Sequence, residues 1–350
     1  MTTFAIDPRS GEFDSKMRQR IAGYFANRKK TGDARLYIKA TILLLSLFTI
    51  LIIFSTTDLP DYLEILLCII LGFIIPGIGF NIMHDAVHRS FCANNKWNKI
   101  LSYSLNLLGG YWPIWEQQHN VEHHMNTNID GRDGDIDFGI IARLHPSQAW
   151  RKWHKYQHIY MPLIFYPLSY LGWIFVLDFI KAKKLNYKFH QYVSMVISKA
   201  IHLLIFIGLP ILKHLPGEVI LGYVIVTVIT GIIISFIFQL AHVVEITEML
   251  DEPEDGKVKR DVVHQLRTTA NFATNNKILS WYIGGLNFQV EHHLYYSISH
   301  VHYPDINKMV KVECKAQNLP YHEYPNLSSA VMSHIKTLKG LGRDPKQIAT

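Results

Sequence analysis

Five long runs of apolar residues divide this sequence, and polar or charged segments separate them. A helix needs about 20 predominantly apolar residues to cross the hydrocarbon core of a bilayer. The runs are therefore candidate membrane spans, and they predict an all-α integral membrane protein. The composition agrees, because 49% hydrophobic residues in a chain of 350 is high for a soluble enzyme. The runs cover residues 40–55, 63–80, 159–180, 193–212 and 218–240.

The basic residues predict which runs cross the membrane. Nine Lys and Arg residues precede the first run, and four lysines follow the third run between positions 181 and 188. Cytoplasmic loops carry an excess of Lys and Arg, so both segments are predicted to be cytoplasmic. The third run, which contains Pro162, Pro167 and Gly172, is then interfacial or re-entrant. The prediction is four transmembrane helices in two hairpins, interfacial helices and a cytoplasmic His-rich cap, with the active site and both termini cytoplasmic.

We expect a single membrane domain over residues 1–350. Residues 1–36 are expected to form a cytoplasmic N-terminal segment with a short amphipathic helix, residues 37–302 a membrane and metal core, and residues 303–350 a cytoplasmic C-terminal segment. The positive-inside rule explains the N-terminal basic cluster, so no nucleic-acid partner is expected. The three cysteines form no CxxC pair, which argues against a disulfide framework or an iron–sulfur site.

Histidines gather where the apolar runs end. His84 and His88 are four residues apart, as are His119 and His123, and residues with this spacing lie on one face of a helix. Each pair is therefore expected to point at one site. His124 is turned by about 100° from its neighbour, so it is expected to reach a second site nearby.

The number and type of these residues predict a centre with two metals. Ionisable groups beside a membrane span are costly and usually mark a functional site. Neutral imidazole suits zinc, copper, nickel and iron. A tetrahedral zinc takes at most four ligands, so eight histidines predict two metals with about four imidazoles each. The candidate metal ligands are His84, His88, His119, His123, His124, His242, His292 and His293.

Carboxylates near these histidines leave their role open. Asp85, Glu122 and Glu291 each neighbour a histidine, where they can accept a ring N–H bond or form a local salt bridge at the surface. The Asp-rich loop at 130–139 lacks the ligand order of a calcium loop and predicts a solvated turn. A metal transporter is an alternative class of protein, but it predicts histidines in mid-span, whereas these lie at span ends.

Three motifs carry a family resemblance. HDAVH at 84–88, HNVEHH at 119–124 and QVEHH at 289–293 resemble the three histidine boxes of membrane fatty acid desaturases. The third box begins with Gln289 in place of histidine, which resembles the front-end acyl desaturases. Those enzymes act between an existing double bond and the carboxyl end of the chain. The segments FQLAHVVE, HQLRTTANF and GGLNFQVEHHL are similar to that branch too, and the resemblance covers roughly 70–310.

The resemblance implies a fatty acyl desaturase whose box histidines, with His242, bind two non-heme irons. Such an enzyme would use O₂ and two electrons to introduce a cis double bond into an acyl chain carried by CoA, a lipid or a carrier protein. Many relatives contain a fused cytochrome b5 domain with an HPGG motif, which is absent from this sequence. The electrons are therefore expected from a separate ferredoxin- or cytochrome b5-type protein. A di-iron lipid hydroxylase is the alternative with the same chemistry.

Two further residues are candidates for a role in catalysis. Gln289 is expected to bind a metal weakly through its carbonyl or to hydrogen-bond a bound water. His264 is expected either to orient a ligand or the substrate headgroup, or to lie on the surface of a helix. The acyl chain is expected in an apolar tunnel among the spans, with Tyr111, Trp112 and Trp115 as candidate lining residues.

Overall fold

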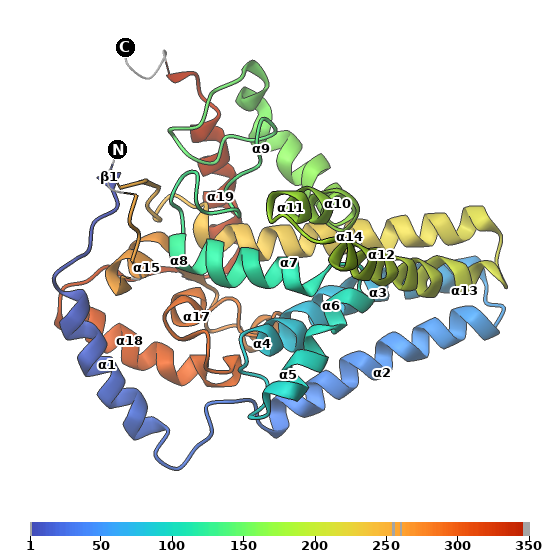
Figure 1. The fold of residues 1–350 in the computed structure, drawn as a ribbon, viewed down its shortest axis with the longest axis horizontal. Helices are drawn as coiled ribbons and strands as arrows, with labels where there is room; N and C mark the ends of the chain where they lie inside the picture. The colour runs from blue at the N-terminus through green and yellow to red at the C-terminus, as the bar shows by residue number, and fades with distance from the viewer. Residues whose placement is uncertain (1, 254–255, 260, 346–350) are drawn as a thin grey trace. The chain divides into compact units, whose positions relative to one another are not determined.

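The computed structural model is almost entirely helical (Figure 1). The all-α class is confirmed, because the only strands among the described residues are four of two or three residues each. The chain forms two compact units, and the predicted single domain of residues 1–350 stays a prediction. Unit 1 consists of Met1–Thr31, Gln117–Pro162 and Phe236–Thr350, and unit 2 of Gly32–Glu116 and Leu163–Ser235. The structure describes residues 2–253, 256–259 and 261–345. Residue 1 of the predicted N-terminal segment and residues 346–350 of the predicted C-terminal segment lie outside the described residues.

Five helical segments are long and apolar enough to cross a membrane. One of them coincides with the run predicted to be interfacial or re-entrant. Its prolines and Gly172 do not break it, because the helix continues through π-helical turns at Met161–Phe165 and Trp173–Leu177. The length of this segment permits a crossing, so the number of four spans stays a prediction. The five segments are Ala34–Thr56, Asp61–Val87, Lys152–Lys184, Phe189–Ile211 and Pro216–His242.

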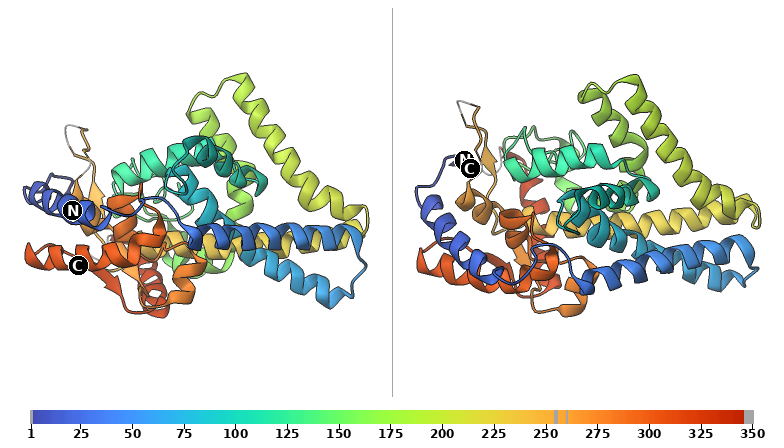
Figure 2. Two further views of the ribbon diagram at one scale, coloured as in Figure 1. Left: turned by 90° about the horizontal axis from the view of Figure 1, so that it is seen from below. Right: turned by 60° about the horizontal axis from the view of Figure 1, so that its bottom comes forward.

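Unit 2 contains the first predicted hairpin, in which α2 (Ala34–Thr56) and α3 (Asp61–Ile78) pack against each other (Figures 1 and 2). Ile38, Leu45 and Ile52 of α2 are 60–62% exposed, as expected for side chains that face lipid. The other elements of this unit are η1 (Gly79–Met83), α4 (His84–Val87), α5 (Asn95–Ser102), α6 (Ser104–Leu107), α7 (Trp112–Glu116), most of η4 (Met161–Phe165), α10 (Tyr166–Gly172), η5 (Trp173–Leu177), α11 (Asp178–Lys184), α12 (Phe189–Leu203), η6 (Leu204–Gly208), α13 (Leu209–Ile211) and most of α14 (Pro216–His242).

Pro76 lies inside α3 without ending the helix. Proline has no N–H, so the carbonyl of Gly72, four residues earlier, lacks its helical donor. The hydroxyl of Thr230 in α14 donates to that carbonyl at 3.3 Å. Gly72 permits the close approach, because a Cβ at this position would lie 2.7 Å from the Cβ of Ile229. The π-helical turn η1 then follows α3 directly, before the first histidine pair.

Two buried polar side chains of α12 contact backbone carbonyls at the end of α6 and just after it. His202 Nδ1 lies 3.0 Å from the carbonyl of Leu107, and Lys199 Nζ donates to the carbonyl of Gly109 at 3.0 Å. Lys199 also forms an ion pair of 2.6 Å with Asp178, and both side chains are buried. Charged groups within a span are tolerated when they pair with one another or with backbone carbonyls, so this cluster ties α11 and α12 to the chain before α7.

Unit 1 contains the predicted N-terminal amphipathic helix, α1 (Ser10–Tyr24). It packs against α18 (Tyr303–Ala316) and buries Phe13, Met17 and Ile21 in a common core. The strands form two parallel pairs, β1 with β2 and β3 with β4. The other elements are β1 (Thr2–Thr3), η2 (Gln117–His123), α8 (His124–Asn126), η3 (Lys152–Tyr156), α9 (Gln157–Tyr160), the end of α14, β2 (Leu250–Asp251), α15 (Val262–Thr268), β3 (Ala270–Phe272), α16 (Lys277–Tyr282), α17 (Gln289–Tyr295), η7 (His300–His302), β4 (His322–Tyr324) and α19 (Leu327–Leu341).

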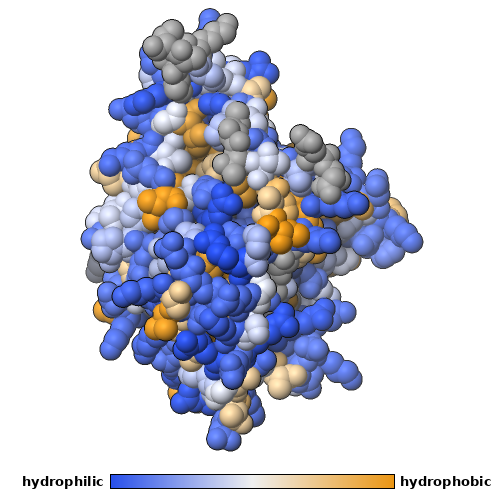
Figure 3. All heavy atoms as spheres, turned by 90° about the vertical axis from the view of Figure 1, so that its left-hand side faces the viewer, coloured by the Kyte–Doolittle hydropathy of each residue, from blue (hydrophilic) through white to orange (hydrophobic). Residues whose placement is uncertain are grey.

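The surface around α1 and α18 is hydrophilic. Figure 3 views the molecule from the side on which these helices lie in Figure 1, and its hydrophobic side chains are scattered among hydrophilic ones. This surface contrasts with the exposed apolar side chains of α2. A surface of this kind is typical of a part that lies in water, outside the hydrocarbon core.

Candidate metal centre

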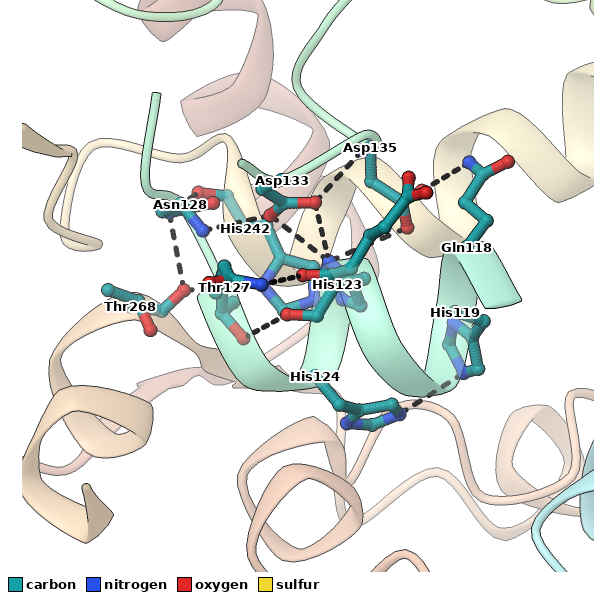
Figure 4. A network of polar contacts seen from close by, with 12 residues as sticks. Gln118, His119, His123, His124, Thr127, Asn128, Asp133, Asp135, His242 and Thr268 are labelled. Atoms are coloured by element: carbon teal, nitrogen blue, oxygen red, sulfur yellow. Dashed lines mark hydrogen bonds and ion pairs between the residues drawn. The ribbon is translucent and has the colours of Figure 1, made fainter. Parts of the chain in front are cut away.

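The second histidine motif lies on a π-helix, η2, which continues into α8. A π-helix pairs residues five apart, whereas the prediction assumed α-helical spacing. Accordingly His119 Nε2 lies 3.2 Å from His124 Nε2, a contact that an α-helix would not make (Figure 4). His119 and His123 can still address one point, which they share with Asp135, as their spacing of four predicted. Segments of π-helix occur frequently at functional sites.

Three buried histidines of unit 1 converge on one point. His123 comes from η2, His242 is the last residue of α14, and His293 lies in α17. Their ring centroids are 4.6–4.9 Å apart, and one ring nitrogen from each lies within 4.8 Å of the other two. This spacing allows the three imidazoles to share one metal ion. The structure therefore brings together candidate ligands from three separate segments, as the two-metal hypothesis requires.

Each of these three imidazoles is held by its Nδ1 atom. His123 Nδ1 lies 3.0 Å from a carboxylate oxygen of Asp133, and His242 Nδ1 lies 3.2 Å from the carbonyl oxygen of Thr268 (Figure 4). His293 Nδ1 lies 2.8 Å from Oε1 of Gln265. These oxygens accept a hydrogen bond, so Nδ1 carries the proton and the lone pair of Nε2 is left for a metal.

His242 gives the most direct test of this assignment. Its Nε2 atom is buried, and among the described residues it has no hydrogen-bond partner. A buried polar atom without a partner is costly unless an ion or a water satisfies it. Three imidazoles, each oriented by a hydrogen bond to its Nδ1 atom, form a donor set that fits a transition metal.

Asp133 controls the charge of His123. Burial opposes protonation of this imidazole, but the carboxylates of Asp133 and Asp135 outweigh it and raise the pKa of His123 to about 9. Without a metal the Nε2 atom of His123 therefore also carries a proton, which a metal would displace on binding. Asp133 is itself held in place, because it accepts the backbone N–H of Asn128 at 2.8 Å. A carboxylate behind a metal-binding imidazole fixes the ring orientation and increases its basicity.

A second group of histidines in unit 1 consists of His119, His124 and His292. The rings of His119 and His292 are stacked at a centroid distance of 5.7 Å, and His124 lies 4.6 Å from each of them. His292 Nδ1 lies 3.2 Å from the hydroxyl of Tyr303. Unit 1 thus contains a second group of three imidazoles, which is in ring contact with the first through His124 and His293.

The first histidine motif lies in unit 2, on the short helix α4. The rings of His84 and His88 are in contact, with centroids 4.7 Å apart, as their spacing of four predicted. Trp115 packs edge-on against His84 at 5.8 Å. Both histidines are buried.

Comparison with known proteins identifies the chain. Residues 60–325 match the family model described as fatty acid desaturase. The chain belongs to the fatty acid desaturase family. It is 32% identical over 345 residues to the sn-1 linoleoyl-lipid 6-desaturase of Synechocystis sp., which covers 95% of this chain and 96% of that protein. It is also 32% identical over 361 residues to the acyl-lipid (8-3)-desaturase of Physcomitrium patens, covering 96% and 73% respectively.

The family expected from the histidine motifs is therefore confirmed, and the chain is a membrane fatty acid desaturase, an oxidoreductase. For the acidic neighbours of the motifs the sequence left two roles open, a hydrogen bond to a histidine ring or a salt bridge at the surface. Asp85 and Glu291 are buried. The carboxylate of Glu291 accepts hydrogen bonds from Asn271 and Asn307, and burial raises its pKa to about 7. Glu122 is half-buried.

The two other predicted site residues of the desaturase, Gln289 and His264, are both buried. Gln289 is the first residue of α17. His264 does not lie on a surface: its Nε2 contacts the carbonyl oxygen of Thr127 at 2.8 Å, and burial lowers its pKa. The neighbour of His264, Gln265, is the residue that contacts a metal-ligand candidate, His293.

Sequence reasoning missed the residues that orient the imidazoles. The loop at 130–139 was expected to be a solvated turn, but its Asp133 is 1% exposed and contacts His123. The repeated aspartates of that loop were the available signal, since carboxylates commonly lie behind metal-binding histidines. The sequence carried no comparable indication that Gln265 and Thr268 orient histidines. Glutamine is a common helix residue, and every residue has a backbone carbonyl.

Proposed function

We propose that this desaturase introduces a cis double bond into an acyl chain of a membrane lipid, on the carboxyl side of an existing double bond. The observation that carries the proposal is the similarity, over almost the whole chain, to proteins named as acyl-lipid desaturases. One of them is named for position 6 of a linoleoyl lipid. Gln289 at the start of the third histidine box supports the same front-end chemistry. Acyl-CoA and acyl-carrier protein are the other carriers to be tested.

We further propose that two iron ions are the cofactors and that the eight histidines of the motifs are their ligands. The convergence of His123, His242 and His293 supports one ion. The ring contacts among His119, His124 and His292 support the second ion. The remaining pair, His84 and His88, is assigned from its motif and from the mutual contact of its rings. Iron would supply the redox chemistry with O₂ that breaking an unactivated C–H bond requires, which zinc does not offer.

Neighbouring residues orient the proposed ligands of this centre through hydrogen bonds to their Nδ1 atoms. Asp133, Gln265 and the Thr268 carbonyl keep the Nδ1 protons in place, so that each Nε2 is available. His264 is proposed to orient a ligand indirectly. It binds the carbonyl of Thr127, and the hydroxyl of Thr127 donates to Gln265, which contacts His293. Gln289 is proposed to bind a metal weakly or to hydrogen-bond a water at the centre.

The orientation of the protein in the membrane belongs to the same proposal. We place both termini and the active site in the cytoplasm, with four transmembrane helices in two hairpins. The basic residues before α2 and after α11 support this orientation. Two electrons for each double bond come from a separate ferredoxin- or cytochrome b5-type protein.

Expression of the enzyme in a host that makes no polyunsaturated fatty acids tests the reaction. The cells are fed linoleic acid, and mass spectrometry locates double bonds separately in the phospholipid and acyl-CoA pools. We expect a new double bond on the carboxyl side, appearing first in the phospholipids, and no product from the His292→Ala variant. A double bond on the methyl side, or a hydroxy acid without a new double bond, would contradict the front-end desaturase. Earlier appearance in acyl-CoA would contradict the lipid carrier.

A further inference from the structure

A half-open apolar cavity of about 180 Å³ lies in unit 2 where α3 and α14 begin. Its walls come from the first turns of these helices and from the ends of α2 and α13, and they include Phe54, Cys68, Leu221 and Val226. The helix that starts with α3 at Asp61 reaches His84 about 35 Å further along, at about 1.5 Å for each residue. This groove is therefore at the opposite end of that span from the histidine motif.

The mouth of the groove is polar and acidic. Asp61, Glu64 and Glu218 line it, together with His214. His214 Nε2 lies 2.7 Å from the carbonyl of Phe54, and its Nδ1 lies 3.4 Å from Glu64. Three carboxylates beside one histidine leave an excess of negative charge. Since Asp61 begins α3 and Glu218 lies in the first turn of α14, this charge is at the depth of lipid headgroups.

We propose that this groove binds one acyl chain of a bilayer phospholipid whose headgroup carries an amine, as in phosphatidylethanolamine. The wall from Glu218 to Val226 is about 12 Å long, enough for a large part of an acyl chain. Lipid tails are as apolar as the groove, so the tail contributes close packing and little selectivity. The headgroup provides the selectivity, because the ammonium group lies beside the carboxylates of the mouth. The enzyme then has a structural lipid site that is separate from its metal centre.

Two tryptophan substitutions on neighbouring residues of α14 test the acyl-chain site. Leu221 lines the groove and is 56% exposed, while Ile220 does not line it and is 54% exposed. The full-length protein is purified with phosphatidylethanolamine, and native mass spectrometry measures the retained lipid. We expect Leu221→Trp to weaken retention by at least about tenfold and Ile220→Trp to retain the lipid as the wild type does. Equal retention by both variants would overturn the proposal.

The headgroup assignment is tested first on the wild-type protein, which requires no variant to fold. We expect stronger retention of phosphatidylethanolamine than of phosphatidylglycerol with the same acyl chains. The double variant Asp61→Asn/Glu218→Gln should lose this preference, whereas Asp58→Asn should keep it, because Asp58 does not line the groove and pairs with Lys213. Equal binding of the two lipids by the wild type, or an unchanged preference in the double variant, would overturn the proposal.

Discussion

The Nδ1 atom of His123 lies 3.0 Å from a carboxylate oxygen of Asp133, and both side chains are buried. This contact joins a histidine of the second box to a loop that matches no histidine box. It fixes the orientation of the imidazole, and it places a negative charge behind a residue that is proposed to bind iron. We therefore expect the metal affinity of the enzyme to depend on a residue outside the family motifs.

We expect Asp133→Asn to lower iron content and activity by about 10- to 100-fold, because asparagine removes the negative charge behind His123. Iron is measured on the purified protein by elemental analysis, and activity by the fatty acid product. Asp137→Asn is the matched control, since Asp137 is an exposed aspartate of the same loop. Wild-type iron content in Asp133→Asn would show that the contact does not support metal binding.

Substitution of one ligand in each histidine group should remove one metal. We expect His123→Ala and His292→Ala to abolish activity and each to lower the bound iron to about half, because they belong to different groups of imidazoles. Insertion into the membrane should be unchanged. His190→Ala is the control, since this histidine is exposed at the start of α12. Normal activity in either ligand variant would exclude that residue as a ligand.

The buried ion pair of Lys199 and Asp178 should stabilise unit 2 only while both charges are present. Lys199→Met leaves an unpaired carboxylate in a buried position, which costs about 3–5 kcal/mol. We expect a lower thermal unfolding midpoint for this variant in detergent and a partial recovery in Lys199→Met/Asp178→Leu. Lys183→Met, at an exposed lysine of α11, should behave like the wild type. A double variant less stable than Lys199→Met would disprove the explanation.

The stability of unit 1 should fall in mild acid because of His334. Its Nδ1 lies 2.7 Å from the carbonyl of Val243, and burial lowers the pKa of this histidine to about 4. The unfolded chain binds a proton below about pH 6.5, whereas the folded chain does not until about pH 4. The folded state therefore loses about 3 kcal/mol as the pH falls through this range, and it keeps its full stability above it.

Unfolding midpoints measured between pH 7.5 and 4.5 test this expectation, because His334→Asn keeps a donor for Val243 without a titratable group. The variant should show a shallower loss of stability in acid than the wild type. The His190→Ala variant serves as the control, because it removes an exposed histidine, and its curve should run parallel to that of the wild type. Parallel curves for the wild type and His334→Asn would rule out this histidine as the cause.

Local patterns in the sequence predicted the class of fold and the ligand types. Apolar runs long enough to span a bilayer predicted the helices, and four-residue spacing predicted the contact of His84 with His88. These features depend on residue type and on neighbours a few positions apart, so they can be read without a structure. The family motifs then indicated a desaturase, which the comparisons confirmed.

Only the tertiary structure decided which residues form hydrogen bonds to the candidate ligands. Gln265 contacts His293 across 28 residues of sequence, and the Thr268 carbonyl contacts His242 across 26. The π-helical turn at Gln117–His123 likewise brings His124 to His119, which α-helical spacing did not predict. Such contacts depend on the path of the backbone and on the packing of distant segments. The sequence by itself determined which imidazoles are available, and the fold decided how each one is oriented, because a hydrogen bond requires two groups at a defined distance and angle.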